Sequence, residues 1–417
     1  MQYRTVYTSA LLVISALLGA GCGESTSSTK GPNYDSNGSD NNGETSSDFD
    51  QRALISNIVD DVITPTFTQF EEKSVQLHSQ LTAYCTAEQG LAQNSVTQDE
   101  RDQAFSQAKQ SWRDAMVQWQ RVEVMQIGPL LNNDNALRNK IYSWPVKSRC
   151  GVDLDVVSFE QGNINGVAYD ISLRTPARKG MLALEYLLFS ETTAHSCTES
   201  TVPQGWDNRT ESSRLIARCE FAVEAAKDIN VNAQSLISQW DGEQGYAQKL
   251  KQAGEQGSEF TTVHDGVNKL SDALFYIDVF TKDSKLATPL GLFANSCGTS
   301  VCPESVESPL AAHSIDNILS NLQALKALYE GEQGLGFDDF LVDENDAITA
   351  QNITQAIDAA IANASAYQVS LAQALLDNEQ QVITTHAEVK AVTDQLKSDF
   401  INSLALELPQ TSAGDND

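Results

Sequence analysis

Positive charge is scarce in this chain of 417 residues. Lys and Arg together number 27 against 56 Asp and Glu, which gives a formal net charge of −29 at pH 7. So acidic a surface repels phosphate backbones and anionic lipid headgroups, and it therefore argues against nucleic acid and an anionic membrane surface as partners. It would suit cationic ligands, or it serves to keep the protein soluble.

Several motifs typical of catalytic and metal sites are also missing. The sequence has no glycine-rich phosphate loop, no GxSxG nucleophile motif, and no Cys-x-x-Cys or Cys/His spacing typical of zinc. No cysteine lies in a local setting with histidine that would suggest a nucleophile. A triad assembled in space from distant residues leaves no such signature, so a nucleophilic hydrolase stays open.

Strict two-residue alternation of apolar residues, the mark of a half-buried strand, is nearly absent. From Phe49 onward, apolar residues instead recur at spacings of three and four, which is typical of helices. The sequence therefore predicts an all-α fold. The clearest stripes lie in 105–122, 260–277, 353–375 and 389–404, and further helices are expected in 135–143, 175–190 and 208–240.

The predicted helices are interrupted at four places, which are Gly128-Pro129, Trp144-Pro145, 190–205 and 287–307. The third is rich in Ser and Thr, and we expect it to divide two packed helical-bundle domains, 49–200 and 201–410. One continuous elongated bundle is the alternative. The comparable helix content of the two halves suggests an ancient duplication.

The first 22 residues have the pattern of an export signal. Arg4 supplies the positive charge, and the apolar run of residues 10–18 is too short to span a bilayer. Residues 17–22, Leu-Leu-Gly-Ala-Gly-Cys, resemble a bacterial lipobox, which implies a signal peptide over 1–21 and a lipid on Cys22. Gly23 follows where an Asp would favour the inner membrane. We therefore expect a lipoprotein of the bacterial outer membrane that faces the periplasm; an ordinary cleaved signal with a free cysteine is the alternative.

Residues 23–47 contain Ser, Asn, Gly, Asp and Thr and almost no apolar side chain. Such a segment buries no core, so residues 22–48 are predicted to form the lipidated cysteine and a flexible tether. Six cysteines remain beyond Cys22, and an even number in an exported chain predicts disulfides. The local pair is Cys297–Cys302. Of the 15 possible connectivities, we expect one that adds Cys197–Cys219 and Cys85–Cys150.

The stretch 175–190 contains the main anomaly of the sequence. Thr175 is a suitable cap, Pro176 suits the first helical position, and nearly every residue after Gly180 is apolar. One carboxylate, Glu185, interrupts this run. A buried carboxylate is costly unless it is protonated, paired or bound to something. We expect Glu185 to accept hydrogen bonds from an Arg or a Trp indole (candidates: Arg113, Arg121 and Arg178), or to bind a ligand.

Five groups of residues then support a resemblance to a known family. They are Trp112–Trp119 with Ile127-Gly128-Pro129, Ile141–Val146, Gly180–Leu188, Lys285–Gly291, and Val306–Ser314 followed by Asp316-Asn317 and Tyr329–Gly331. In this order they resemble the imelysin family over roughly 49–406. The resemblance implies an all-helical, two-domain envelope protein, in a group linked to iron uptake and historically called peptidases.

The family's GxHxxE motif, whose His and Glu are its supposed metal or active-site pair, is incomplete here. Gly180 and Glu185 match, but Leu182 stands at the His position. Leucine offers no lone pair to a metal and moves no proton. Because a catalytic metal usually takes three protein ligands, the peptidase interpretation loses its main support.

Other residues could complete a site. Glu185, Glu307, His313 and Asp316 would form a composite metal site, for a divalent metal or iron, if the second half folds over the first. His313 and Asp316 could equally cap and solvate a helix start. Trp112, Trp144 and Arg113 are candidates for lining a binding pocket, although tryptophans in helical stripes usually belong to the core.

The sequence thus favours a non-catalytic binding protein linked to the acquisition of iron or another metal ion, with its ligand in the cleft between the domains and Glu185 at the floor. Its expected partners are the outer-membrane lipid through Cys22 and proteins of iron uptake. The alternatives are a metallopeptidase of the imelysin family and a structural or interaction protein of the outer membrane.

Overall fold

The computed structural model describes residues 29–30 and 49–413. The expected export signal, Cys22 and most of the tether lie outside these residues. Thr29–Lys30 of the predicted tether forms strand β1, which pairs antiparallel with β4 (Glu407–Leu408) near the other end of the chain. Within the described residues, no helix combines the length and the apolar character needed to cross a bilayer.

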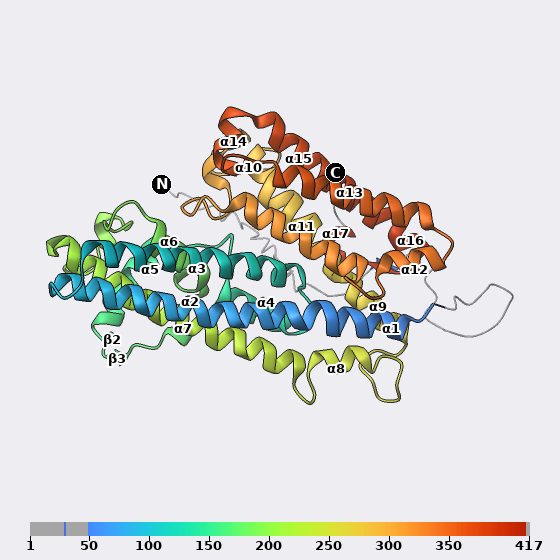
Figure 1. Cartoon of the computed structure of the whole chain (residues 1–417), viewed down its shortest axis with the longest axis horizontal. Coiled ribbons are helices and arrows are strands. Elements are labelled where there is room, and N and C mark those ends of the chain that lie inside the picture. Colours follow the sequence, from blue (N-terminus) through green and yellow to red (C-terminus); the bar gives the residue numbers. More distant parts are fainter. Residues whose placement is uncertain (1–28, 31–48, 414–417) are drawn as a thin grey trace, which may run out of the picture.

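The described part is mostly helical, as the apolar periodicity predicted (Figure 1). Its first elements are α1 (Gln51–Asn57), η1 (Ile58–Ile63), α2 (Thr64–Ala92), α3 (Gln98–Val124), η2 (Gly128–Leu130), α4 (Asn132–Ile141), α5 (Arg149–Glu160), β2 (Asn163–Ile164), β3 (Val167–Ala168), η3 (Ile171–Leu173), η4 (Pro176–Arg178), α6 (Gly180–Phe189), η5 (Glu199–Thr201), η6 (Trp206–Asn208), α7 (Glu211–Asp241) and α8 (Tyr246–Lys251). β2 and β3 pair as a small hairpin.

The remaining elements are α9 (Val263–Ser271), η7 (Asp272–Phe275), η8 (Ile277–Ala287), α10 (Thr288–Leu290), η9 (Pro303–Ser305), α11 (Ser314–Glu330), α12 (Phe337–Asp343), α13 (Ala347–Ser365), α14 (Leu371–Asp377), α15 (Glu379–Gln395), η10 (Leu396–Phe400), α16 (Ile401–Ser403) and α17 (Gln410–Ala413).

The N-terminal helices α2–α7 form one packed group. The long helices α2, α3 and α7 run side by side, and α5 and α6 pack against α7 (Figure 1). Helix α3 begins at a capping box in which Thr97 and Glu100 exchange hydrogen bonds, as their spacing favours. Its apolar stripe buries Trp112 and Trp119 completely. Burial of such large side chains is a main source of stability in a helical group.

The C-terminal helices form a second group, in which α11, α13, α15 and η8 pack on one another. Helix α11 also packs on α3, so it joins the two groups. The buried apolar residues of both groups belong to one contiguous core. Helix α7 lies beyond the predicted boundary at residue 200, yet it packs with the N-terminal helices; the division of the chain into two domains stays a prediction.

Two predicted helices differ from the observed ones. The stripe in 353–375 is divided between α13 and α14, with Ala366–Ser370 outside any helix. In the stretch 175–190, the α-helix begins only at Gly180, and the Thr175 side chain makes no capping hydrogen bond. Gly180 has φ +70°, and a Cβ there would lie 2.4 Å from the Ile141 carbonyl oxygen. Glycine is therefore required where the chain turns into α6.

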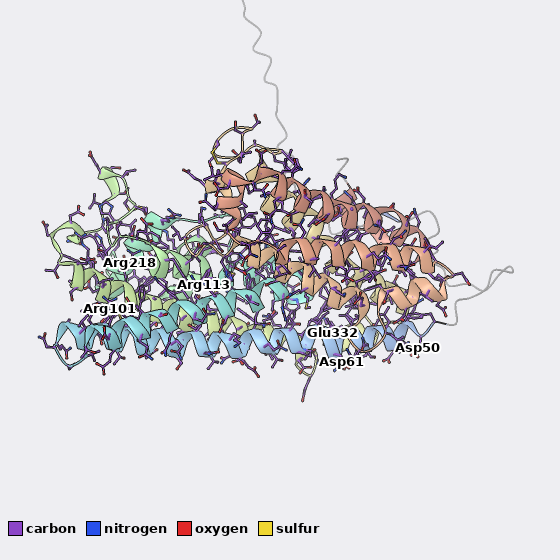
Figure 2. The ribbon with its side chains drawn as sticks, turned by 45° about the horizontal axis from the view of Figure 1, so that its top comes forward. Asp50, Asp61, Arg101, Arg113, Arg218 and Glu332 are labelled. Atoms are coloured by element: carbon purple, nitrogen blue, oxygen red, sulfur yellow. A yellow bond between two sulfur atoms is a disulfide. The ribbon has the colours of Figure 1, made fainter. Side chains whose placement is uncertain are left out.

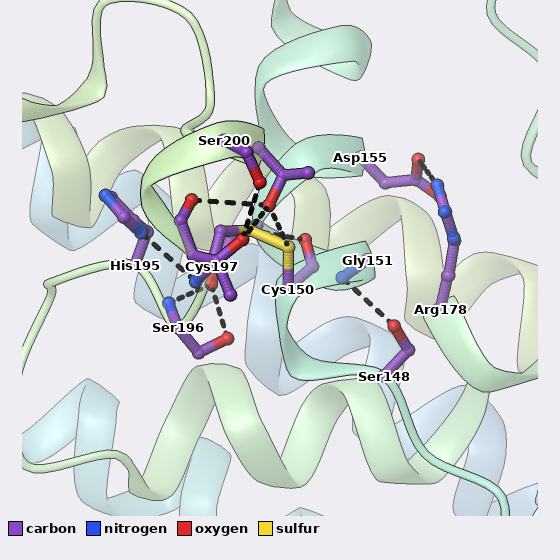
Figure 3. The surroundings of a disulfide bond; sticks show 12 residues. Ser148, Cys150, Gly151, Asp155, Arg178, His195, Ser196, Cys197 and Ser200 are labelled. Carbon is purple, nitrogen blue, oxygen red and sulfur yellow. Dashed lines mark hydrogen bonds and ion pairs between the residues drawn. A yellow bond between two sulfur atoms is a disulfide. The ribbon is translucent and has the colours of Figure 1, made fainter.

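Three disulfides are present, Cys85–Cys219, Cys150–Cys197 and Cys297–Cys302. The pairing of Cys297 with Cys302 confirms the prediction. The pairings Cys197–Cys219 and Cys85–Cys150 are wrong, because α2 and α7 lie side by side and place Cys85 next to Cys219. Cys150–Cys197 instead joins the first turn of α5 to the segment after α6 (Figure 3).

Candidate functional site

Glu185 lies in the middle of α6, and only 4% of it is exposed. Its neighbours on α6 are apolar and almost all buried, as the sequence predicted. Leu182, at the position of the missing family histidine, is also buried and lies one turn earlier. The helix therefore places a single carboxylate in an apolar interior, where an unsatisfied charge would be costly.

The partners of Glu185 are backbone groups. Its Oε1 accepts hydrogen bonds from the backbone N–H of Leu310, at 2.9 Å, and of Ala311, at 3.1 Å. Both residues belong to the segment that precedes α11, residues 306–313, which we call the 306–313 loop. The prediction that an arginine donates a hydrogen bond to Glu185 is wrong, because each of the three candidate arginines has another contact.

Arg113, labelled in Figure 2, lies over the Phe189 ring, 4.8 Å from its centroid. Arg121 donates to Gln323, and Arg178 pairs with Asp155. No described residue donates a hydrogen bond to the second oxygen of Glu185, Oε2. This oxygen is thus available to whatever occupies the space beside it.

Burial raises the pKa of Glu185 from an ordinary value of 4.5 to about 7. The backbone N–H groups of Ala311 and Leu310 and the ammonium of Lys147 oppose this rise, and the carboxylate of Glu307 adds to it. Loss of water around a charged carboxylate outweighs two hydrogen bonds here. Glu185 therefore changes its charge near neutral pH and is a candidate functional residue.

Glu307 is buried in a polar cluster that joins the two groups of helices. Its carboxylate accepts hydrogen bonds from Tyr142 (2.8 Å) and Gln120 (3.1 Å), and it lies 3.2 Å from the ammonium of Lys285. Lys285 is itself 1% exposed and donates to the side chain of Asn321 at 2.8 Å. Both hydrogen bonds to Glu307 go to Oε1, whereas Oε2 faces the Lys285 ammonium as an ion pair without a hydrogen bond among the described residues. A buried carboxylate paired with a cation in this way fits a structural role.

His313 and Asp316 pair with each other. The His313 Nδ1 lies 3.0 Å from the Asp316 carboxylate, and the His313 ring packs against Trp112. The hydrogen bond from His313 lowers the pKa of Asp316. Since Glu185, Glu307 and this pair each have separate partners, the predicted four-residue metal site is not assembled. Across the described residues, no group of three or more His, Cys, Asp or Glu is placed to hold a metal ion.

A cleft of about 840 Å³ lies between the two groups of helices. It is lined by Trp144, Pro145, Lys147 and Arg149 from the segment that joins α4 to α5, and by Ser284, Thr288, Ser296, Glu304, Ser305 and Pro309 from the C-terminal part. This volume is typical of a small-molecule site.

A narrow recess of about 20 Å³ adjoins the cleft and shares Trp144, Lys147, Arg149 and Pro309 with it. Glu185 and Leu182 line the recess, which has room for about one water molecule. Of the predicted pocket residues, Trp144 thus lines the cleft, whereas Trp112 is a core residue whose indole donates to the Met181 carbonyl.

Sequence analysis missed Lys147, Arg149 and the C-terminal residues of the cleft. Lys147 and Arg149 follow directly after the Trp144-Pro145 break, and two cations so close together are conspicuous in so acidic a chain. That local excess of positive charge could have indicated Lys147 and Arg149 as candidate binding residues. The residues contributed by 284–309 gave no such signal, because they are ordinary Ser, Thr and Pro residues and one Glu in a chain rich in acidic residues.

The fold and the site define a mostly helical protein with a cleft between two packed groups of helices. The sequence matches the imelysin family (peptidase M75) over residues 63–398, and the chain belongs to this family. Iron-regulated protein A of Synechococcus elongatus is 23% identical over 293 residues, which cover 68% of this chain and 67% of that protein.

Two solved structures share the fold. An imelysin-like protein from Psychrobacter arcticum superposes with a TM-score of 0.57 at 16% identity, covering 87% of this chain and 99% of its own. A structure from Parabacteroides distasonis, described as an iron-regulated protein A precursor, superposes with a TM-score of 0.60 at 16% identity. The match covers 87% of this chain and 96% of that one. At this identity the likeness establishes the fold alone.

Replacing Glu185 by Gln tests its raised pKa. Between about pH 4.5 and 7 the folded protein holds a proton that the unfolded chain has lost, so wild-type stability falls as pH rises through this window. Gln keeps the acceptor oxygen and cannot ionise. We expect the free energy of unfolding of Glu185→Gln, relative to wild type, to increase by roughly 3 kcal/mol between the two ends of the window.

Denaturant unfolding at several pH values measures this difference. The control is Glu304→Gln, which removes an exposed carboxylate of the cleft. Parallel pH profiles for wild type and Glu185→Gln would show that Glu185 ionises as an ordinary carboxylate.

Proposed function

We propose that this protein is a binding protein of the bacterial cell envelope, linked to the acquisition of iron or another metal ion, and that it does not cleave peptides. Its ligand is held in the cleft between the two groups of helices. The observation that carries the proposal is the cleft itself, which has the volume of a small-molecule site and receives residues from both groups.

The comparisons support the iron link. A relative covering two thirds of the chain and a solved structure with the same fold are both described as iron-regulated protein A. That description concerns those proteins, and its transfer to this chain is part of the proposal. Leu182 supports the non-catalytic part, because a leucine at the histidine position removes one ligand from any catalytic metal there.

Iron retention by the purified protein tests the function. After incubation with ferric citrate or a ferrous salt and removal of unbound ions, we expect iron in a fixed ratio to protein. Ser284→Trp places a large side chain in the cleft and should abolish retention, since Ser284 lines it. The control Ser79→Trp adds the same side chain on the outer face of α2 and should retain iron.

Failure to retain iron or any other metal, or undiminished retention by Ser284→Trp, would contradict the proposal. Cleavage of unfolded protein substrates that stops when a chelator is added would favour a metallopeptidase instead. Absence of both activities would favour the structural or interaction role.

We also propose that the protein is an outer-membrane lipoprotein facing the periplasm. Three disulfides fit an oxidising compartment outside the cytoplasm. The lipobox-like residues 17–22 and the polar segment after Cys22 support a lipid anchor on a tether. Proteins of iron uptake in the same envelope are the expected partners.

Labelling with radioactive palmitate tests the anchor. Wild type should incorporate label and sediment with outer membranes, whereas Cys22→Ser should do neither because the acylated thiol is gone. Cys297→Ser serves as the control for loss of a cysteine. Label in Cys22→Ser, or none in wild type, would contradict the anchor.

A further inference from the structure

The cleft is positively charged on one wall, although the chain as a whole carries a net charge of −29. Lys147 and Arg149 line it, and Glu304 is the single carboxylate among its lining residues. No described residue forms an ion pair with Lys147 or Arg149, whereas most other cations of the protein are paired. Two cations without ion-pair partners in the described part of the chain give this part of the cleft a positive potential, which favours binding of an anion.

The position of Arg149 is fixed by its surroundings. It is the first residue of α5, directly after the N-cap Ser148, whose hydroxyl accepts the Gly151 N–H at 3.2 Å (Figure 3). The next residue, Cys150, is bonded to Cys197, and Ser148 N–H donates to the Ala177 carbonyl at 3.1 Å. These contacts hold the backbone beside the cleft, so only the side chains must be ordered when a ligand binds.

Most hydrogen-bond donors that line the cleft belong to the same segment as Arg149. Lys147 offers three N–H donors and Arg149 five, and no described residue accepts from the indole N–H of Trp144, which also lines the cleft. On the opposite wall, the hydroxyls of Ser284 and Thr288 already donate to the carbonyls of Val279 and Asp283. The hydroxyls of Ser296 and Ser305 also line the cleft and contact each other at 3.1 Å. The charged donors therefore all belong to one segment, and charge-assisted hydrogen bonds are the strong ones that carboxylate or phosphate oxygens accept.

A bare metal cation does not suit this cleft. Lys147 and Arg149 would repel it, and the described residues offer no group of three ligands to compensate. Burial, and after it the neighbouring Arg149, lower the pKa of Lys147, and the Glu185 carboxylate opposes this only in part. An anion between Lys147 and Arg149 would relieve the repulsion between these two cations.

We propose that the cleft binds a small organic anion with several carboxylate groups, held by Lys147 and Arg149, and that iron enters it as the chelate of such an anion. This inference rests on the proposed function and narrows it to a class of ligand. The cleft recognises the oxygens of the carrier molecule, and the metal needs no side chain of the protein as a ligand.

Calorimetric titration of the full chain at pH 6 and low salt tests the proposal, with citrate, ferric citrate and ferrous sulfate as separate probes. We expect citrate or ferric citrate to bind. The double variant Lys147→Gln/Arg149→Gln should bind at least about ten-fold more weakly, because two charge-assisted contacts are lost. Its melting temperature should stay close to that of wild type, since both residues are exposed and neither forms an ion pair among the described residues.

The matched control is Arg52→Gln/Lys227→Gln, which removes one exposed Arg and one exposed Lys that do not line the cleft. It changes the net charge equally and should bind as wild type does. Equal binding of citrate and ferric citrate identifies the organic anion as the recognised group, and binding of ferric citrate alone identifies the chelate; either supports the proposal.

Undiminished binding by the Lys147→Gln/Arg149→Gln variant overturns the inference. So does binding of ferrous ion without binding of either citrate probe, although the proposed iron-linked function then stands. If none of the three probes binds, the inference fails, and iron retention in the cleft fails with it.

Discussion

The hydrogen bonds between Glu185 and the 306–313 loop are the contact on which the architecture of the site depends. Glu185 belongs to α6 of the N-terminal group, and the N–H groups of Leu310 and Ala311 belong to the C-terminal part. Glu307, in the same loop, reaches Gln120 and Tyr142 of the N-terminal group. Two buried carboxylates thus fix one loop against the opposite group of helices, and Pro309 of this loop lines the cleft.

In this chain the glutamate of the GxHxxE motif has a structural role in place of the supposed metal-binding one. With Leu182 at the histidine position, Glu185 has no neighbouring side chain with which to share a metal, and it accepts backbone hydrogen bonds instead. Its carboxylate joins the halves of the protein and also borders the recess next to the cleft. The cations Lys147 and Arg149 line both spaces. The proposed recognition of an anion therefore rests on the segment between α4 and α5 and not on the motif helix.

Sequence reasoning succeeded where the signal is local. Apolar spacing predicted the helices, and the apolar neighbours of Glu185 predicted its burial. It failed where distant segments meet. Leu310 and Ala311 lie 125 and 126 residues from Glu185 and contribute backbone N–H groups, which no side-chain pattern reveals. The pairing of Cys85 with Cys219 likewise depends on α2 lying beside α7. The overall negative charge suited either cationic ligands or solubility, and neither interpretation indicated the local cations of the cleft.

Amide hydrogen exchange of the 306–313 loop tests the central claim most directly. If Glu185 holds the loop, the N–H groups of Leu310 and Ala311 exchange slowly in wild type and in Glu185→Gln, whose side-chain oxygen still accepts both hydrogen bonds. In Glu185→Ala they should exchange much faster, while amides in the middle of α2 keep their protection. Rapid exchange of these two amides in wild type, or unchanged protection in Glu185→Ala, would contradict the account.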